Sequence, residues 1–103
     1  MCLFVFFDLP NVTKKQKKRA VYFVKSLKRH GFRKFQYSIY QRHCGSHAHA
    51  NVFERRVRVI IPEEGHVSIL RITDSQFSAI RNFWGGKETK EQLSKPLKQL
   101  TLF

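Results

Sequence analysis

The apolar and polar positions near the start of the chain predict a strand. Residues 3–7 are all apolar, and three of them are phenylalanines. So short a run does not suit a globular helix and is typical of a strand buried on both faces. Side chains alternate along a strand, which gives Leu3, Val5 and Phe7 on one face and Phe4, Phe6 and Asp8 on the other. Pro10, which lacks an N–H group, then ends the pairing.

The apolar residues of the next segment recur at the spacing of a helix. A helix is expected from about Lys14 to His30, with Thr13 or Asn11 as its N-cap. Its apolar positions are Ala20, Val21, Phe23, Val24 and Leu27. Gly31 ends the helix, because glycine adopts the left-handed conformation that usually follows a last turn.

Residues 33–43 predict strand structure. One apolar face is expected, and it consists of Phe35, Tyr37 and Ile39, with Gln36, Ser38 and Tyr40 opposite. The strand either continues with a bend or splits near Ser38, and no Gly, Pro, Asn or Asp marks a turn there. A second helix is then expected from about His47 to Ile61, with Ser46 as its cap.

A further strand is expected from His66 to Thr73, and it is apolar on both faces. Val67 and Ile69 share one face, whereas Leu70 and Ile72 share the other. Helices can cover only one side of such a sheet, so the other side needs a cover of its own. The simplest cover is the sheet of a second copy of the chain.

The last third of the chain is less regular. Residues 74–80 predict a short helical turn capped by Asp74, and a strand through Phe83 and Trp84 is closed by two glycines. We therefore expect one folded domain over residues 1–86, and a polar linker with a C-terminal strand over residues 87–103. That strand suits addition to the edge of a partner's sheet, and a disordered end is the alternative.

Charge narrows the choice of partner. The 103 residues include 20 Lys and Arg but only 7 Asp and Glu, a formal net charge of +13. A polyanionic partner is the leading expectation, with a merely solubilising surface as the alternative. The first helix has eight cations and no carboxylate, so it is expected to face phosphates rather than water alone.

The cysteine content and the hydropathy of the chain indicate where in the cell the protein is expected. Two cysteines cannot form a disulfide framework and are typical of a reduced, intracellular protein. No segment approaches the roughly 20 apolar residues that span a bilayer, and no signal peptide is recognisable. The cytoplasm is the expected location, without membrane association.

Asp8 is the strongest single candidate for chemistry. A carboxylate at a strand end is a ligand for Mg²⁺ or another divalent cation, which needs one or two carboxylates and keeps several waters. One aspartate per chain suffices if a two-fold axis brings two copies together. The structural alternative is a cap or a salt bridge at the strand end.

Other motifs are weaker. A possible soft-metal cluster consists of His43, Cys44, His47 and His49, but its spacing matches no standard zinc pattern and favours a loop and a helix start. Residues 30–37 match the aromatic RNA-recognition motif only out of register. No phosphate-binding glycine loop is present.

Several motifs together resemble one family. They are Phe-Phe-Asp-Leu-Pro at the end of the first strand, the basic helix, Gly31-Phe32 before Gln-Tyr-Ser-Ile-Tyr, Thr-Asp-Ser-Gln-Phe from Thr73, and Phe83-Trp84-Gly85. Over positions 1 to about 86 the chain is similar to the CRISPR-associated adaptation proteins that are the second of two universal adaptation components. The terminal Leu-Thr-Leu-Phe resembles that family's added strand.

The resemblance implies a fold, partners and a site. The fold is α+β and ferredoxin-like, an antiparallel sheet with two helices on one face, in a homodimer whose sheets face each other. The dimer associates with the CRISPR integrase in spacer acquisition for antiviral defence. Asp8 corresponds to the family's strand-end aspartate, a divalent-metal ligand of a nuclease activity.

Two functions therefore compete. The first is a non-catalytic scaffold that holds double-stranded DNA for the integrase, with RNA as the alternative ligand. Its candidate contacts, doubled by symmetry, are Lys14, Lys15, Lys17, Lys18 and Arg19. The second is a Mg²⁺-dependent endonuclease or endoribonuclease that uses paired Asp8 carboxylates. A single carboxylate per chain provides no separate general base for that reaction.

Overall fold

The computed structural model describes residues 1–88 of the chain. In chain order the elements are β1 (Cys2–Asp8), α1 (Lys14–Arg29), β2 (Arg33–Gln36), β3 (Ile39–His43), α2 (His47–Ile60), β4 (His66–Ile72), α3 (Asp74–Ser78), β5 (Phe83–Trp84) and β6 (Lys87–Glu88). Four strands form an antiparallel sheet in the order β2-β3-β1-β4, and β5 and β6 form a separate hairpin. The βαββαβ order and this topology confirm the predicted ferredoxin-like α+β fold.

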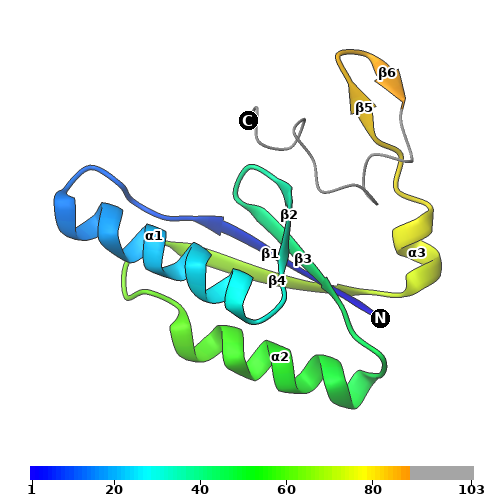
Figure 1. Cartoon of the computed structure of the whole chain (residues 1–103), viewed down its shortest axis with the longest axis horizontal. Helices are drawn as coiled ribbons and strands as arrows, with labels where there is room; N and C mark the ends of the chain where they lie inside the picture. Colours follow the sequence, from blue (N-terminus) through cyan, green and yellow to red (C-terminus); the bar gives the residue numbers. More distant parts are fainter. Residues whose placement is uncertain (89–103) are drawn as a thin grey trace.

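Helices α1 and α2 lie together on one side of the four-stranded sheet (Figure 1). Between them and the sheet lies the main core, whose buried members include Leu3, Val5, Phe23, Leu27, Tyr40, Phe53 and Val57. Phe7 of β1 packs edge-on against Phe23 of α1, with ring centroids 5.2 Å apart. The predicted grouping of Leu3, Val5 and Phe7 on one face is therefore confirmed, and the structure shows that this face lies under the helices.

Local interactions define both ends of α1. The Thr13 hydroxyl accepts a hydrogen bond from the Gln16 N–H at 3.1 Å, and the Gln16 side-chain oxygen accepts one from the Thr13 N–H at 3.0 Å. This reciprocal capping box satisfies N–H groups that have no partner inside the helix. At the other end Gly31 has φ +82°, and the Phe32 N–H donates to the Leu27 carbonyl at 3.0 Å. The predicted cap and stop are both confirmed.

Helix α2 also begins as predicted and is tied to the sheet by polar contacts. The Ser46 hydroxyl accepts a hydrogen bond from the His49 N–H at 3.1 Å. Arg71 of β4 donates to Asn51 at 2.9 Å and forms an ion pair with Glu54 at 3.3 Å. These contacts fix the second helix over β4.

The other face of the sheet is covered only in part. Cys2, Phe4 and Phe35 are buried there by Phe77 and Ile80, which come from α3 and the residue shortly after it. Farther along the same face the cover ends. Phe6 is 36% exposed and Leu70 is 47% exposed. The structure thus confirms the apolar second face, and it adds α3 as a cover for one end.

Residues 33–43 form a hairpin rather than one strand. Strands β2 and β3 pair through Gln36 and Ile39, so Tyr37 and Ser38 form the turn. Ser38 has φ +62°, a conformation that the sequence does not signal because it is more usual for Gly or Asn. Because the turn interrupts the strand, side chains after it do not continue the in-and-out alternation of those before it. Tyr40 is buried and Tyr37 is 68% exposed, so the predicted apolar face was wrong for these two residues.

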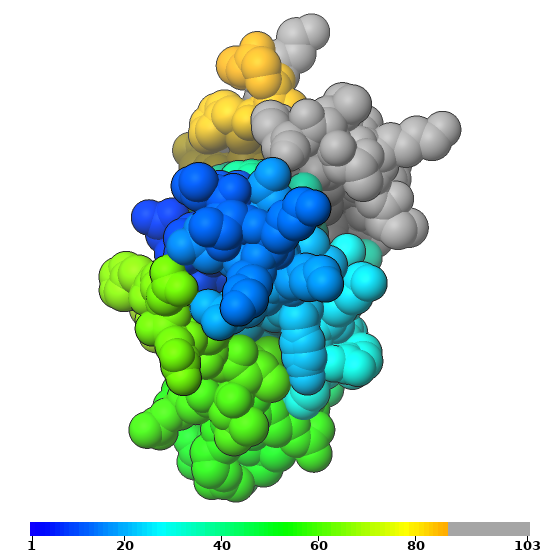
Figure 2. Space-filling model, turned by 90° about the vertical axis from the view of Figure 1, so that its left-hand side faces the viewer, coloured from blue at the N-terminus to red at the C-terminus, as the bar shows by residue number. Residues whose placement is uncertain are grey.

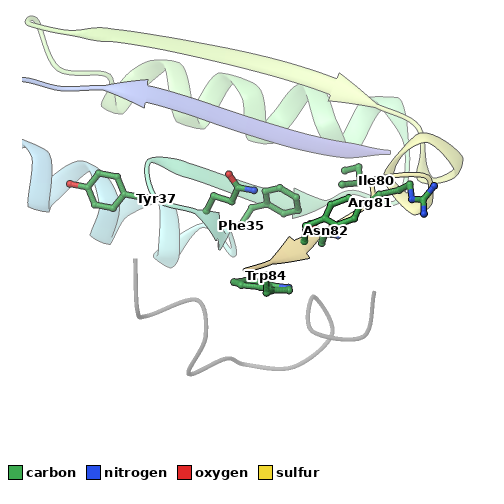
Figure 3. Close-up of a pocket in the computed structure, with 8 residues that line it drawn as sticks. Phe35, Tyr37, Ile80, Arg81, Asn82 and Trp84 are labelled. Atoms are coloured by element: carbon green, nitrogen blue, oxygen red, sulfur yellow. The ribbon is translucent and has the colours of Figure 1, made fainter. Parts of the chain in front are cut away.

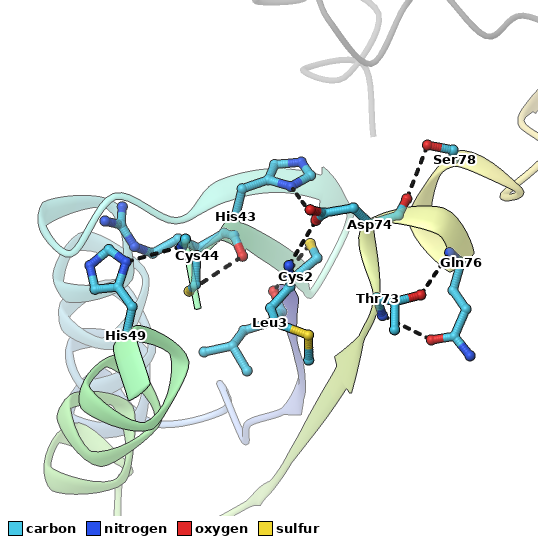
Figure 4. Close-up of polar contacts among 12 residues, drawn as sticks. Cys2, Leu3, His43, Cys44, His49, Thr73, Asp74, Gln76 and Ser78 are labelled. Atoms are coloured by element: carbon cyan, nitrogen blue, oxygen red, sulfur yellow. Dashed lines mark hydrogen bonds and ion pairs between the residues drawn. The ribbon is translucent and has the colours of Figure 1, made fainter. Parts of the chain in front are cut away.

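Two smaller predictions are also corrected. Thr73, not Asp74, caps α3, because its hydroxyl accepts the Gln76 N–H at 3.0 Å. The Asp74 carboxylate instead accepts a hydrogen bond from the Met1 amine at 2.9 Å (Figure 4). Lys87–Glu88 form β6 rather than the start of a linker, while the predicted C-terminal strand lies outside the described residues. In residues 1–88 no helix has the length and apolar character needed to cross a bilayer.

The close approach of the Arg42 side chain to Gly31 can be tested by substitution. A Cβ at Gly31 would meet the Arg42 guanidinium, whose carbon lies 3.8 Å from the centre of the Phe53 ring. Because φ is positive and Arg42 must move, Gly31→Ala should lower the free energy of unfolding by about 2 kcal/mol in urea denaturation.

Gly85→Ala is the matched control for that variant. Gly85 has φ +59°, but a Cβ there meets nothing within 4 Å. Its cost should be about 1 kcal/mol, from backbone conformation alone. If both variants lose the same free energy of unfolding, the displacement of Arg42 from the Phe53 ring does not add to the cost of Gly31→Ala.

Candidate nucleic-acid interface

Asp8 lies at the end of β1 on the incompletely covered face of the sheet. It is exposed and directly opposite His66 in the pairing of β1 with β4. Within residues 1–88 its carboxylate makes no hydrogen bond and no ion pair, so the structural alternative of a cap or salt bridge finds no support there. The aspartate is therefore available to a ligand or to a second copy of the chain.

The described residues of one protomer do not provide a complete metal site around Asp8. Among residues 1–88 no three His, Cys, Asp or Glu side chains are grouped so that they could hold a metal ion. The Asp8 carboxylate has the oxygen donors that Mg²⁺ prefers, whereas the neighbouring His66 offers a nitrogen that suits transition metals better. Because Mg²⁺ is held by one or two carboxylates and keeps several waters, Asp8 fits it as one ligand, and waters, phosphate oxygens or a carboxylate of a second protomer would complete the shell.

The start of α1 is an exposed cationic surface. Lys14, Lys15, Lys17 and Lys18, which we call the helix-start lysines, are all exposed. Figure 2, viewed toward this end of the helix, shows the first turns of α1 (blue) projecting beside α2 and the loop before β4 (green). In residues 1–88 these lysines form no ion pair. They are free to contact an external anion.

Arg19 differs from the other predicted contacts. Its guanidinium forms an ion pair with Glu64 at 3.1 Å, and Gln16 donates a hydrogen bond to the same carboxylate at 3.0 Å. Glu64 belongs to the loop that precedes β4. Arg19 thus holds this loop against α1, and Glu64 partly neutralises its charge.

The cationic surface extends farther along α1 than the sequence prediction placed it. An open hollow of about 680 Å³ lies along the helix, and its lining residues are Lys17, Lys18, Val21, Tyr22, Lys25, Lys28 and Arg29. The cations Lys18, Lys25 and Arg29 recur at i, i+7 and i+11, the spacing of one helix face. That spacing could have indicated these additional residues before the structure was known.

Three of the four residues of the possible soft-metal cluster make structural contacts, and the fourth, His47, is the first residue of α2. The His49 ring accepts the Gly45 N–H at 3.2 Å, and Cys44 is buried (Figure 4). His43 lies 3.8 Å from Asp74 and packs edge-on against Phe77 at 4.6 Å. These contacts confirm the interpretation of this segment as a loop and a helix start.

The pKa shifts of Asp74 and Cys2 agree with structural roles for both residues. A hydrogen bond from the Met1 amine, together with its positive charge, lowers the pKa of Asp74. Burial raises the pKa of the Cys2 thiol to about 11, with the nearby Cys44 as the second cause. A thiol with so high a pKa is a poor nucleophile near neutral pH. Cys2 is therefore a core residue rather than a reactive one.

Comparison with known proteins identifies the family. A family model described as CRISPR associated protein Cas2 matches residues 1–80. The chain belongs to the Cas2 family. Asp8, the whole of α1 and the β2–β3 hairpin all lie within the matched part. The resemblance noted from the sequence motifs is thereby confirmed.

Individual relatives within the Cas2 family match most of the chain. The protein named CRISPR-associated endoribonuclease Cas2 of Flavobacterium psychrophilum is 44% identical over 101 residues, 98% of this chain and 86% of that protein. The protein of the same name from Parvibaculum lavamentivorans is 39% identical over 103 residues, the full length of both. CRISPR-associated endoribonuclease Cas2 2 of Rhodospirillum rubrum is 44% identical over 86 residues, 84% of this chain and 77% of that protein. Each of these three relatives thus matches at least 84% of this chain.

Proposed function

We propose that this Cas2-family chain forms a homodimer that binds double-stranded DNA as a non-catalytic scaffold for the CRISPR integrase during spacer acquisition. The proposal depends above all on one observation, the cluster of exposed lysines at the start of α1. None of them has an acidic partner within residues 1–88. The proposed dimer presents two such clusters.

Electrostatics explains why these lysines point to a ligand. The N-terminus of a helix is the positive end of its dipole, so each lysine there costs roughly 0.3–1 kcal/mol instead of stabilising the helix. Lys14 and Lys18 also form a like-charged pair one turn apart, which is unfavourable by a few tenths of a kcal/mol. A phosphate backbone would remove both penalties. Contacts of this kind position a duplex without reading its sequence.

The partly covered sheet face supports the proposed homodimer. Phe6 and Leu70 are neighbours of the buried Phe4 on this face, and they expose apolar surface to water. A second copy packed against the same face would bury both side chains. The arrangement would also place the two Asp8 carboxylates on the shared face and double the helix-start lysines.

Leu70→Glu tests the dimer. A carboxylate at this position would be buried without a partner in the dimer but solvated in the monomer, so the variant should be monomeric at concentrations where the wild type is a dimer. Sedimentation equilibrium measures the difference. Val59→Glu is the matched control, because Val59 is 84% exposed on α2, away from the sheet. Its dimer should persist. A monomeric wild type at micromolar concentration would exclude the proposed dimer.

Charge reversal tests the scaffold. Replacement of all four helix-start lysines by glutamate should abolish duplex DNA binding and spacer acquisition. Replacement of one of them by alanine should reduce the slope of log affinity against log salt by about 0.9 for each lost phosphate contact, or about 1.8 for a dimer in which both copies contact the duplex. Arg19→Ala should reduce the slope less, because Glu64 already balances that charge. Fluorescence anisotropy over a salt series measures these slopes.

Asp8→Ala separates the scaffold from catalysis. The variant should keep duplex binding and should still support spacer acquisition in cells, because a scaffold needs no carboxylate at this position. Loss of acquisition in an Asp8→Ala protein that still folds and dimerises would disprove the non-catalytic scaffold.

A second candidate function is a Mg²⁺-dependent endonuclease, which the position of Asp8 favours. Its carboxylate has no partner in residues 1–88 and lies on the face proposed for the dimer, where two copies could share one ion. Several relatives are named endoribonucleases. The ion would polarise a phosphoryl oxygen of RNA or DNA, and the two Asp8 side chains would hold it.

The nuclease requires both the metal and Asp8. Purified dimer should cleave single-stranded RNA or duplex DNA with Mg²⁺, and both EDTA and Asp8→Asn should abolish cleavage, as gel analysis of labelled substrates would show. Asp8→Asn preserves side-chain shape while removing the charge. Cleavage that persists in the Asp8→Asn protein would instead come from a contaminating nuclease.

A further inference from the structure

Two tyrosines expose large aromatic surfaces on the helix side of the molecule. Tyr22 of α1 is 53% exposed and Tyr37 of the β2–β3 turn is 68% exposed. Each ring lies beside a cation. The Arg29 guanidinium carbon is 5.6 Å from the centre of the Tyr22 ring, and the Lys34 ammonium is 5.7 Å from that of Tyr37. Exposed aromatic rings next to cations are typical of surfaces that bind ligands.

The two tyrosines border one continuous surface. The hollow of about 680 Å³ along α1 includes Tyr22, and an adjoining hollow of about 350 Å³ includes Tyr37. Val21, Lys25 and Lys28 line both hollows. We call this surface the tyrosine groove, and it consists of Val21, Tyr22, Lys25, Lys28, Arg29, Lys34 and Tyr37. Figure 3 shows Tyr37 pointing away from Trp84 and toward the side where α1 lies.

The backbone fixes Tyr37 in its exposed position. The following residue, Ser38, has φ +62°, and its carbonyl accepts a hydrogen bond from the Phe7 N–H at 3.1 Å. Non-glycine residues adopt this conformation rarely, and such residues cluster at ligand sites. The turn is therefore anchored to the central strand and holds the tyrosine ring out of the core.

The charge of the tyrosine groove selects the class of ligand. Every charged side chain that lines the two hollows is a cation, and no Asp or Glu of the described chain contributes to either lining. A duplex backbone needs only such cations. Exposed rings add nothing to phosphate contacts, but they provide platforms on which unpaired bases stack, and single-strand-binding proteins combine these two features.

We propose that the tyrosine groove binds single-stranded nucleic acid, with unpaired bases stacked on Tyr22 and Tyr37 and phosphates held by Lys25, Lys28, Arg29 and Lys34. The inference rests on the proposed function, because it adds a base-contacting site to the phosphate-contacting helix-start lysines. The site lies along α1 and the β2–β3 turn, and it does not involve Asp8.

Alanine and phenylalanine substitutions in the full-length protein test the groove. The probe is a single-stranded DNA of about 16 nucleotides containing 2-aminopurine, whose fluorescence is quenched by stacking. Tyr22→Ala and Tyr37→Ala should each weaken binding at least about fivefold and reduce the quenching. Tyr22→Phe and Tyr37→Phe keep the ring and should stay within about twofold of the wild type. All four variants should bind duplex DNA as the wild type does, because no charge is lost.

The outcomes separate this inference from the proposed function. If the alanine variants bind single strands as tightly as the wild type, or if the wild type binds duplex only, the tyrosine groove is not a base-stacking site and the scaffold still stands. If the wild type binds neither form at low ionic strength, the proposed function itself fails. If the alanine variants lose only the binding of a partner protein, the groove is a protein-docking surface and the inference is overturned.

Discussion

Strand β1 lies in the middle of the sheet and is apolar on both faces, so both faces must be shielded from water. Helices α1 and α2 shield one face through Phe23, Phe53 and their neighbours. On the other face α3 reaches only as far as Phe4, which leaves Phe6 partly exposed. Among residues 1–88 no helix covers that end of the face, and the proposed dimer would cover it with a second copy of the chain.

Acidic and basic side chains are used differently in this protomer. The carboxylates of Glu54, Glu64 and Asp74 are used inside the protomer, where they bind Arg71, Arg19 and the Met1 amine. These three ion pairs fasten α2, the loop before β4 and α3. The cations of α1 other than Arg19 have no such acidic partners in residues 1–88. Their mutual repulsion costs stability, and the proposed binding of a polyanion would offset that cost.

The two candidate functions, binding of a duplex and metal-dependent hydrolysis, make different physical demands on the chain. Catalysis would require groups besides the Asp8 carboxylate, because residues 1–88 contain no cluster of three metal-ligating side chains and place only His66 opposite Asp8 in the sheet. Binding requires only what one protomer already presents, an exposed cationic helix. Binding therefore requires fewer additional groups than hydrolysis does.

The sequence by itself determined the elements that depend on neighbours along the chain. The apolar run of β1, a helix cap at Thr13 or Asn11 and the glycine after α1 act over a few residues, so periodicity and cap residues sufficed to predict them. Asp8 and the lysines were likewise readable as site candidates. Only the tertiary structure decided the β2–β3 turn, where Ser38 takes a positive φ that its identity does not signal. It also decided the pairing of Arg19 with Glu64 and the approach of Tyr37 to α1, since contacts between distant residues depend on how the elements pack.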